Sequence, residues 1–111
     1  MPQGYFYLLI AIIGEVVATS ALKAANGFSE TLPSILVVVG YGVAFYYLSL
    51  SLKTIPLGIS YAIWSGVGVV AVSLMGWVYY KQALDIAALI GMAMILGGVL
   101  VIHLFSNSTA H

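Results

Sequence analysis

The sequence predicts an all-α membrane protein with four transmembrane helices. Hydrophobic residues make up 63% of the 111 residues and charged residues only 5%, whereas a soluble domain carries about 25% charged residues. Charges and turn residues divide the chain into four apolar stretches, each close to the roughly 20 residues that cross a ~30 Å hydrocarbon core. We therefore expect a single transmembrane domain over residues 1–111, with almost nothing outside the bilayer.

The helices are expected over about residues 5–22, 33–52, 56–80 and 86–105. The first should stop at Lys23 and the pair Asn26-Gly27, because these residues readily adopt the left-handed conformation that ends a helix. Pro33 suits the first turn of the second helix, where its missing N–H is not needed. Asp85 is the expected N-cap of the fourth helix. The short connections require consecutive helices to pack as antiparallel hairpins.

The charges exclude several classes of function. Three acidic and three basic residues balance, so the chain offers no basic surface to nucleic acid. The absence of cysteine excludes disulfides, thiolate metal sites and a cysteine nucleophile. His103 and His111 are too far apart in the sequence to indicate a metal site. The helix spacings bring no nucleophile and base together, so we expect neither an enzyme nor a cofactor.

Glu15 is the only charged residue inside the first apolar stretch. Charged side chains at the centre of a membrane helix cost about 2.5–3.5 kcal/mol on insertion scales, so such an acid is expected to be a proton or cation site. Thr19 lies one helical turn further on and can hydrogen-bond the carboxylate. Leu8, Ala11 and Ala18 share the same helix face, and the two alanines leave space beside the acid.

Aromatic side chains are expected near this acid. Tyr41 and Phe45 are four residues apart on the second helix, and Tyr61 and Trp64 are three apart on the third. Such rings suit a lipophilic cation, because cation–π attraction is worth up to about 2 kcal/mol when desolvated. Rings at the helix ends are instead expected to anchor the chain at the membrane interface: Tyr5, Phe6, Tyr7, Trp77, Tyr79 and Tyr80.

Four helices leave little room for a ligand, so a polar pathway is expected to need at least two copies or a partner subunit. Gly91 and Gly98 lie on one face of the fourth helix, and small residues let membrane helices approach closely. We therefore predict a dimer contact at this face. Gly66 and Gly68 lie in the middle of the third helix and predict a hinge.

The lysines predict little orientation preference. If the helices alternate, Lys23 and Lys81 lie on one side of the membrane and Lys53 on the other. Lysine and arginine near the membrane ends set orientation, so a split of two to one favours insertion in both directions. A homodimer could then contain one copy of each orientation, although a partner subunit could also fix the matter.

These residues together resemble the small multidrug resistance family of proton-coupled drug exporters. The most specific piece runs from Pro56 to Gly68, with the segment Gly14 to Thr19 in support. The resemblance covers the whole chain and implies an antiparallel homodimer in the bacterial inner membrane. It also implies roles for particular residues: Glu15 as the shared proton and substrate site, Tyr61 and Trp64 as substrate-contacting rings, Tyr41, Phe45, Leu8, Ala11 and Thr19 as the chamber lining, Gly66 and Gly68 as the hinge, and Gly91 and Gly98 as the dimer contact.

The preferred function is proton-coupled export of quaternary ammonium compounds and aromatic cationic dyes. The guanidinium-exporting branch of the family typically has Trp three residues after the membrane acid, where this chain has Ala18. Export of guanidinium ions remains an alternative, as do a proton or cation channel and a structural membrane protein that transports nothing.

Overall fold

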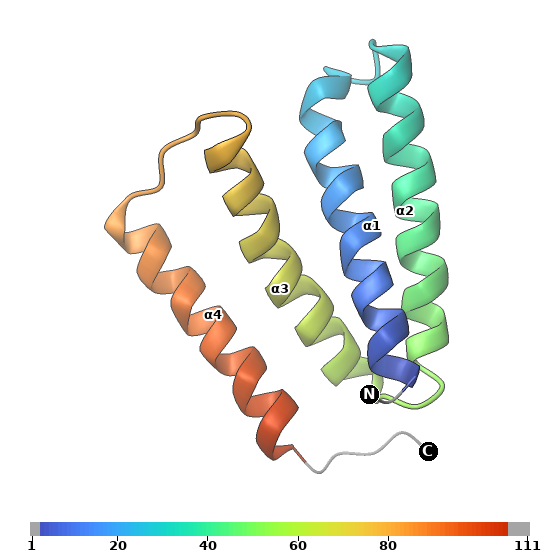
Figure 1. Cartoon of the computed structure of the whole chain (residues 1–111), viewed down its shortest axis with the longest axis vertical. Coiled ribbons are helices and arrows are strands. Elements are labelled where there is room, and N and C mark those ends of the chain that lie inside the picture. The colour runs from blue at the N-terminus through green and yellow to red at the C-terminus, as the bar shows by residue number, and fades with distance from the viewer. Residues whose placement is uncertain (1–2, 107–111) are drawn as a thin grey trace.

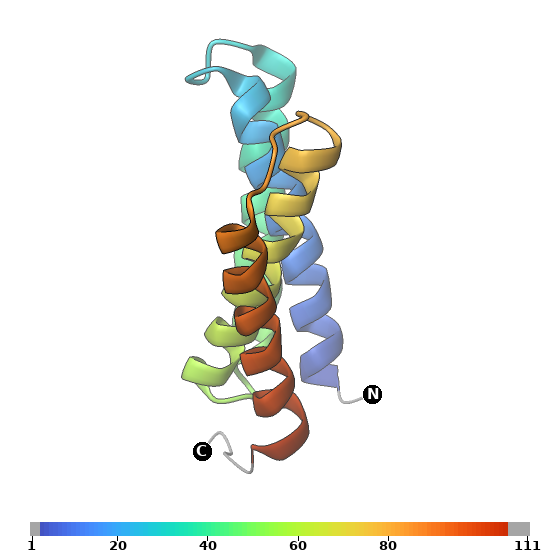
Figure 2. The same ribbon diagram turned by 90° about the vertical axis from the view of Figure 1, so that its left-hand side faces the viewer.

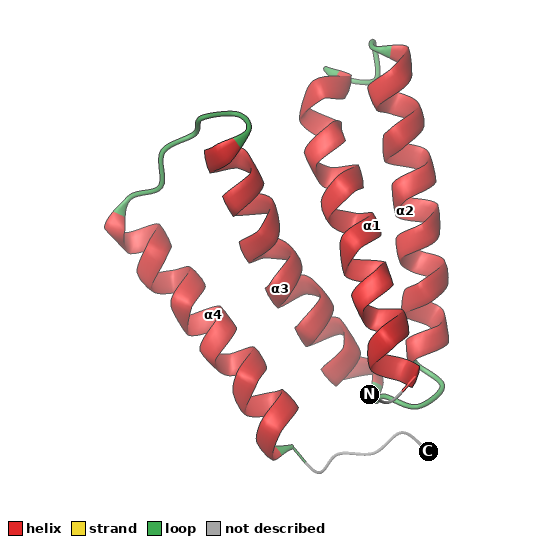
Figure 3. Cartoon of the chain, in the orientation of Figure 1, coloured by secondary structure: helices red, strands yellow, loops and turns green. Residues whose placement is uncertain are grey.

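The structure, a computed structural model, describes residues 3–106. Within that range it contains four helices and no strands: α1 (Gln3–Ala25), α2 (Thr31–Ser51), α3 (Leu57–Val78) and α4 (Ile86–Phe105). Figure 3 shows these helices joined by short loops. All four are long and apolar enough to cross a membrane. The predicted class, an all-α protein with four spanning helices, is confirmed.

Two helix ends show the capping residues that the sequence predicts. Asn26 and Gly27 have φ angles of 48° and 69°, so the chain leaves α1 through the left-handed region, as the sequence predicts. At the start of α4, the Asp85 carboxylate accepts a hydrogen bond of 2.8 Å from the backbone N–H of Ala88. This bond satisfies one of the free N–H groups at the helix start and confirms Asp85 as the N-cap.

The helices form a flat arrangement rather than a closed four-helix core (Figures 1 and 2). Helix α1 packs against both α2 and α3, and α4 packs mainly against α3. The molecule measures 43 × 34 × 20 Å. Its shortest dimension is about two helix diameters, and its longest matches a bilayer of about 40–45 Å including headgroups. The start of α1 and the end of α4 lie at the same end of the bundle (Figure 1), as an even number of crossings requires.

Small residues bring α1 and α2 into close contact. A β-carbon on Gly14 would lie 3.0 Å from the carbonyl oxygen of Gly40, and one on Gly40 would lie 2.8 Å from the β-carbon of Ala18. Ala44, one turn beyond Gly40, is completely buried. Glycine and alanine four residues apart on each helix therefore let the two backbones touch, as is typical of membrane helix pairs.

Helix α4 is the most apolar span and the least covered. None of its residues is buried within the chain. Its one tight contact with α3 is at Gly66, where a β-carbon would lie 2.9 Å from Val99 and 3.1 Å from Ile95. Gly91 and Gly98 have open space where a β-carbon would be. The face that carries these two glycines is therefore free within the described part of the chain.

Candidate cation and proton site

Glu15 lies in the middle of α1 and forms one end of a short hydrogen-bonded chain whose centre is Thr19. The Thr19 hydroxyl donates to Oε1 of Glu15 at 3.2 Å. The same Thr19 oxygen lies 2.6 Å from the Tyr41 hydroxyl of α2. The other carboxylate oxygen, Oε2, is buried and has no hydrogen-bond partner among residues 3–106. Because buried polar atoms are rarely left unpaired, one oxygen of this acid is available for a proton or a ligand.

Helix α3 comes close to Glu15 at Gly68. A β-carbon on Gly68 would lie 2.7 Å from Oε2 of Glu15, so any other residue would displace the carboxylate. Gly66 makes the same kind of approach toward α4, as described above. Helix α3 runs without interruption through both glycines. Close packing is thus a second reason for glycine at these positions, and the hinge remains a prediction.

Four aromatic rings form a row from α2 to α3 beside the acid. The Tyr41 and Phe45 ring centroids are 6.2 Å apart, those of Phe45 and Trp64 are 5.7 Å apart, and those of Trp64 and Tyr61 are 5.5 Å apart. The Trp64 side chain is buried, whereas Phe45 and Tyr61 are 54% and 56% exposed. The sequence-predicted rings therefore lie together, and Phe45 and Tyr61, on either side of the buried Trp64, are open.

Two further predicted lining residues belong to the hydrophobic core of the chain. Leu8 and Ala11 are almost completely buried and belong to the same hydrophobic cluster as Trp64. Their contact with a substrate remains a prediction. The indole N–H of Trp64 is buried and has no acceptor among the described residues. It is a second unpaired polar group in the region of Glu15.

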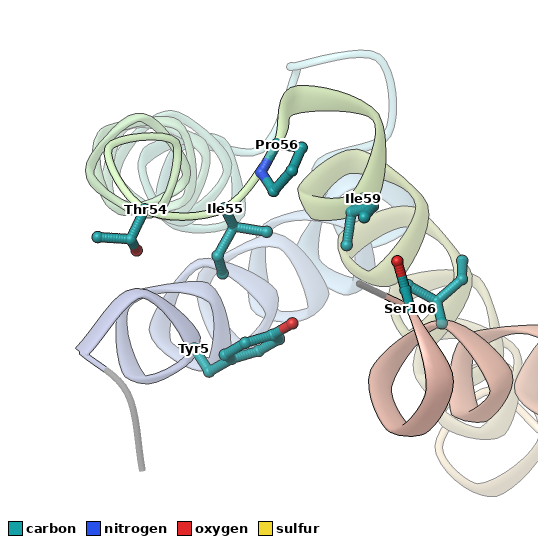
Figure 4. Close-up of a pocket in the computed structure, with 7 residues that line it drawn as sticks. Tyr5, Thr54, Ile55, Pro56, Ile59 and Ser106 are labelled. Atoms are coloured by element: carbon teal, nitrogen blue, oxygen red, sulfur yellow. The ribbon is translucent and has the colours of Figure 1, made fainter. Parts of the chain in front are cut away.

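A separate cavity of about 230 Å³ lies at the end of the bundle where α2 turns into α3. Figure 4 shows Tyr5 of α1 facing the turn residues Thr54 to Pro56, with Ile59 and Ser106 beside them. Ile102 also lines the cavity. Neither Glu15 nor the row of rings lines this cavity. Residues 3–106 contain no cluster of His, Asp or Glu able to hold a metal ion. The acid and rings on α1, α2 and α3 are therefore the strongest candidate site.

Comparison with known proteins decides the family. Residues 3–95 match the Small Multidrug Resistance protein family. The chain belongs to this family. The chain is 50% identical over 109 residues to the quaternary ammonium compound-resistance protein QacE of Escherichia coli, covering 98% of this chain and 99% of that protein. It is 47% identical over 107 residues to the multidrug transporter EmrE of Escherichia coli, covering 96% and 97%.

A multidrug transporter of Pseudomonas aeruginosa is 56% identical over 107 residues, covering 96% of this chain and 97% of that protein. The resemblance drawn from the sequence is therefore confirmed. Membership of the Small Multidrug Resistance family and four membrane-spanning helices make the chain a multi-pass protein of the bacterial inner membrane.

Sequence reasoning missed two features of this family member. It did not identify Gly14 and Gly40 as the α1–α2 contact that places Glu15, although the pairs Gly14/Ala18 and Gly40/Ala44 are visible in the sequence. It also assigned Tyr80 only an interfacial role. The Tyr80 hydroxyl in fact donates a hydrogen bond of 2.7 Å to the backbone carbonyl of Ser20 on α1, a contact between distant segments that no local pattern indicates.

Proposed function

We propose that this chain is an antiporter that exchanges protons for lipophilic organic cations, including quaternary ammonium compounds and aromatic dyes, and exports them across the inner membrane. The observation that carries the proposal is the state of Glu15. One carboxylate oxygen is held by Thr19, and the other is buried and unpaired next to a row of aromatic rings. Such an oxygen can hold a proton or face a cation. The names of the relatives QacE and EmrE support the same substrate class.

Competition between a proton and the organic cation for Glu15 couples the transport of one to the transport of the other. A proton on Glu15 removes the negative charge that attracts the cation, and a bound cation disfavours the proton. The carrier therefore exchanges one for the other, and the proton gradient is the only energy source that it needs. The proposal includes no cofactor and no catalytic step.

We propose that the working unit is an antiparallel homodimer. One chain leaves the site open, because Phe45 and Tyr61 are more than half exposed and α4 buries none of its residues. A second copy would cover both surfaces, with the Gly91 and Gly98 face of α4 as the contact. Two opposed copies can exchange conformations, so the two Glu15 side chains, one from each copy, face each side of the membrane in turn.

Transport by the purified protein tests this function. In proteoliposomes with a pH gradient, we expect uptake of tetraphenylphosphonium by the unmodified protein and none by Glu15→Gln. Glu30→Gln is the matched control, because Glu30 is exposed and its side chain makes no cap hydrogen bond at the start of α2. Uptake that persists in Glu15→Gln would contradict the proposal.

The same liposomes distinguish the alternative substrate class. Ala18 is completely buried against Gly40, at the position where the guanidinium-exporting branch typically carries Trp. We expect tetraphenylphosphonium to be transported in preference to guanidinium. Faster transport of guanidinium would assign the chain to the other branch, and transport of neither ion would favour a structural role.

A further inference from the structure

A second, smaller cavity lies between the end of α1 and the end of α3. Its volume is about 150 Å³, enough for several water molecules but below the roughly 300–1,000 Å³ of sites that hold drug-sized ligands. The polar residues that line this cavity are Thr19, Ser20, Lys23, Tyr80 and Gln82. We call it the vestibule. Of its lining residues, the exchange described above uses only Thr19.

The vestibule reaches Glu15 through one hydroxyl. Thr19 both lines the cavity and donates its hydrogen bond to Oε1 of Glu15. The neighbouring Ser20 hydroxyl is buried and finds no hydrogen-bond partner within residues 3–106. A buried unpaired hydroxyl on the wall of a cavity with room for water is a position that water is expected to fill. Water there would connect Ser20 with Thr19, and Thr19 with the acid.

Tyr80 lines the vestibule and is held in place by two contacts with α1. Its hydroxyl donates to the Ser20 carbonyl at 2.7 Å, and the Lys23 ammonium lies 5.6 Å from the centre of its ring. The chain turns sharply just after this residue, because Lys81 has a φ of 58°. The backbone N–H of Gln82 then donates a hydrogen bond of 3.0 Å to the Gly76 carbonyl of α3. Tyr80, two residues beyond the end of α3, thus ties that end of the helix to α1.

We propose that the vestibule is a proton route to Glu15, separate from the path of the organic cation, and that the Tyr80–Ser20 hydrogen bond is its latch. This inference rests on the proposed antiport function. The cavity is too small for a drug-sized cation, and the Lys23 ammonium among its lining residues repels one. Water and hydroxyl groups can nevertheless pass a proton through the vestibule to Thr19. The cation would reach Glu15 from the other side, across the exposed rings of Phe45 and Tyr61.

Two substitutions test the latch and the route in turn. Tyr80→Phe removes the hydrogen bond and keeps the ring beside Lys23, so the vestibule should open more often. We expect the substrate-free decay of a pH gradient in proteoliposomes to accelerate about two- to tenfold, the range that the loss of one neutral hydrogen bond gives. Adding Ser20→Val to Tyr80→Phe replaces the hydroxyl on the vestibule wall by apolar groups that cannot hold water, so the decay should return toward that of the unmodified protein.

Tyr79→Phe is the matched control, since this adjacent tyrosine is exposed and its hydroxyl makes no hydrogen bond within the described residues. Its pH-gradient decay should equal that of the unmodified protein. Tetraphenylphosphonium affinity, measured at fixed pH, should be the same in all variants if they are folded. Equal decay in Tyr80→Phe and Tyr79→Phe would overturn the proposal, as would a double variant that still leaks. If the unmodified protein does not exchange protons for the cation, the proposed antiport function is contradicted, whatever the result for the proton route.

Discussion

The carboxylate of Glu15 occupies the space that a β-carbon on Gly68 would need, because such a carbon would lie 2.7 Å from Oε2. The acid on α1 therefore reaches the backbone of α3 without an intervening side chain. Trp64 is one helical turn earlier on α3 and is packed against Phe45. The acid and the rings are thus held together by a helix contact that only glycine permits.

Replacing Gly68 by alanine should weaken cation binding. Overpacking of this kind costs about 1–3 kcal/mol, so we expect the Kd for tetraphenylphosphonium to rise at least about fivefold. Gly42→Ala is the control, because Gly42 has open space around it within the chain. Calorimetric titration of both variants measures the difference. An unchanged Kd for Gly68→Ala would show that the carboxylate does not need this space.

Trp64 and Tyr61 should contribute more to cation binding than rings at the helix ends. Trp64→Ala and Tyr61→Ala each remove a ring beside the site, and a desolvated cation–π contact is worth up to about 2 kcal/mol. Tyr79→Ala removes an exposed ring beyond the end of α3 and serves as the control. Affinities for a planar dye would separate the two classes. Equal losses in all three variants would indicate general destabilisation.

The contact between α1 and α2 should be sensitive to side-chain size. Gly40→Leu would drive a branched side chain into Ala18, whose β-carbon is 2.8 Å from the position of the first added carbon. We expect the free energy of unfolding to fall by about 1–3 kcal/mol. Gly42→Leu, two residues along the same helix, should have little effect. Unfolding in SDS followed by circular dichroism measures both, and equal stabilities would show that α1 and α2 are not closely packed.

The sequence predicts the helices better than it predicts their contacts. Composition and the local signals at Asn26-Gly27 and Asp85 are enough to set the number of helices and two of their ends. Glycine is common in membrane helices, however, and nothing local shows that Gly14 meets Gly40 rather than lipid. The acid, too, is evident in the sequence, because a charge in an apolar run has a large cost. The hydrogen-bond partner of Tyr80 is not evident in the sequence, because Ser20 contributes only its backbone carbonyl.

Orientation should respond to single charges. Ala83→Lys adds a third lysine to the end that holds Lys23 and Lys81, whereas Gln3→Lys with Lys81→Asn leaves the excess at the opposite end. Asparagine also tolerates the positive φ of position 81. Each variant should insert in one orientation, and cysteine labelling from either side of the membrane measures the outcome.

Each of these orientation variants should transport poorly alone, and co-expression should restore transport, because the proposed dimer needs one copy of each orientation. Full activity of one variant with every copy in a single orientation would contradict the antiparallel arrangement.

Proton release on cation binding tests the central claim most directly. Detergent-purified protein in weakly buffered solution is titrated with tetraphenylphosphonium while a pH indicator records free protons. The account predicts that protons are released as the cation saturates the site, that Glu30→Gln behaves identically, and that Glu15→Gln releases none. Because the proton and the cation compete, the Kd should also fall as pH rises. Cation binding without proton release, or release that persists in Glu15→Gln, would contradict the account.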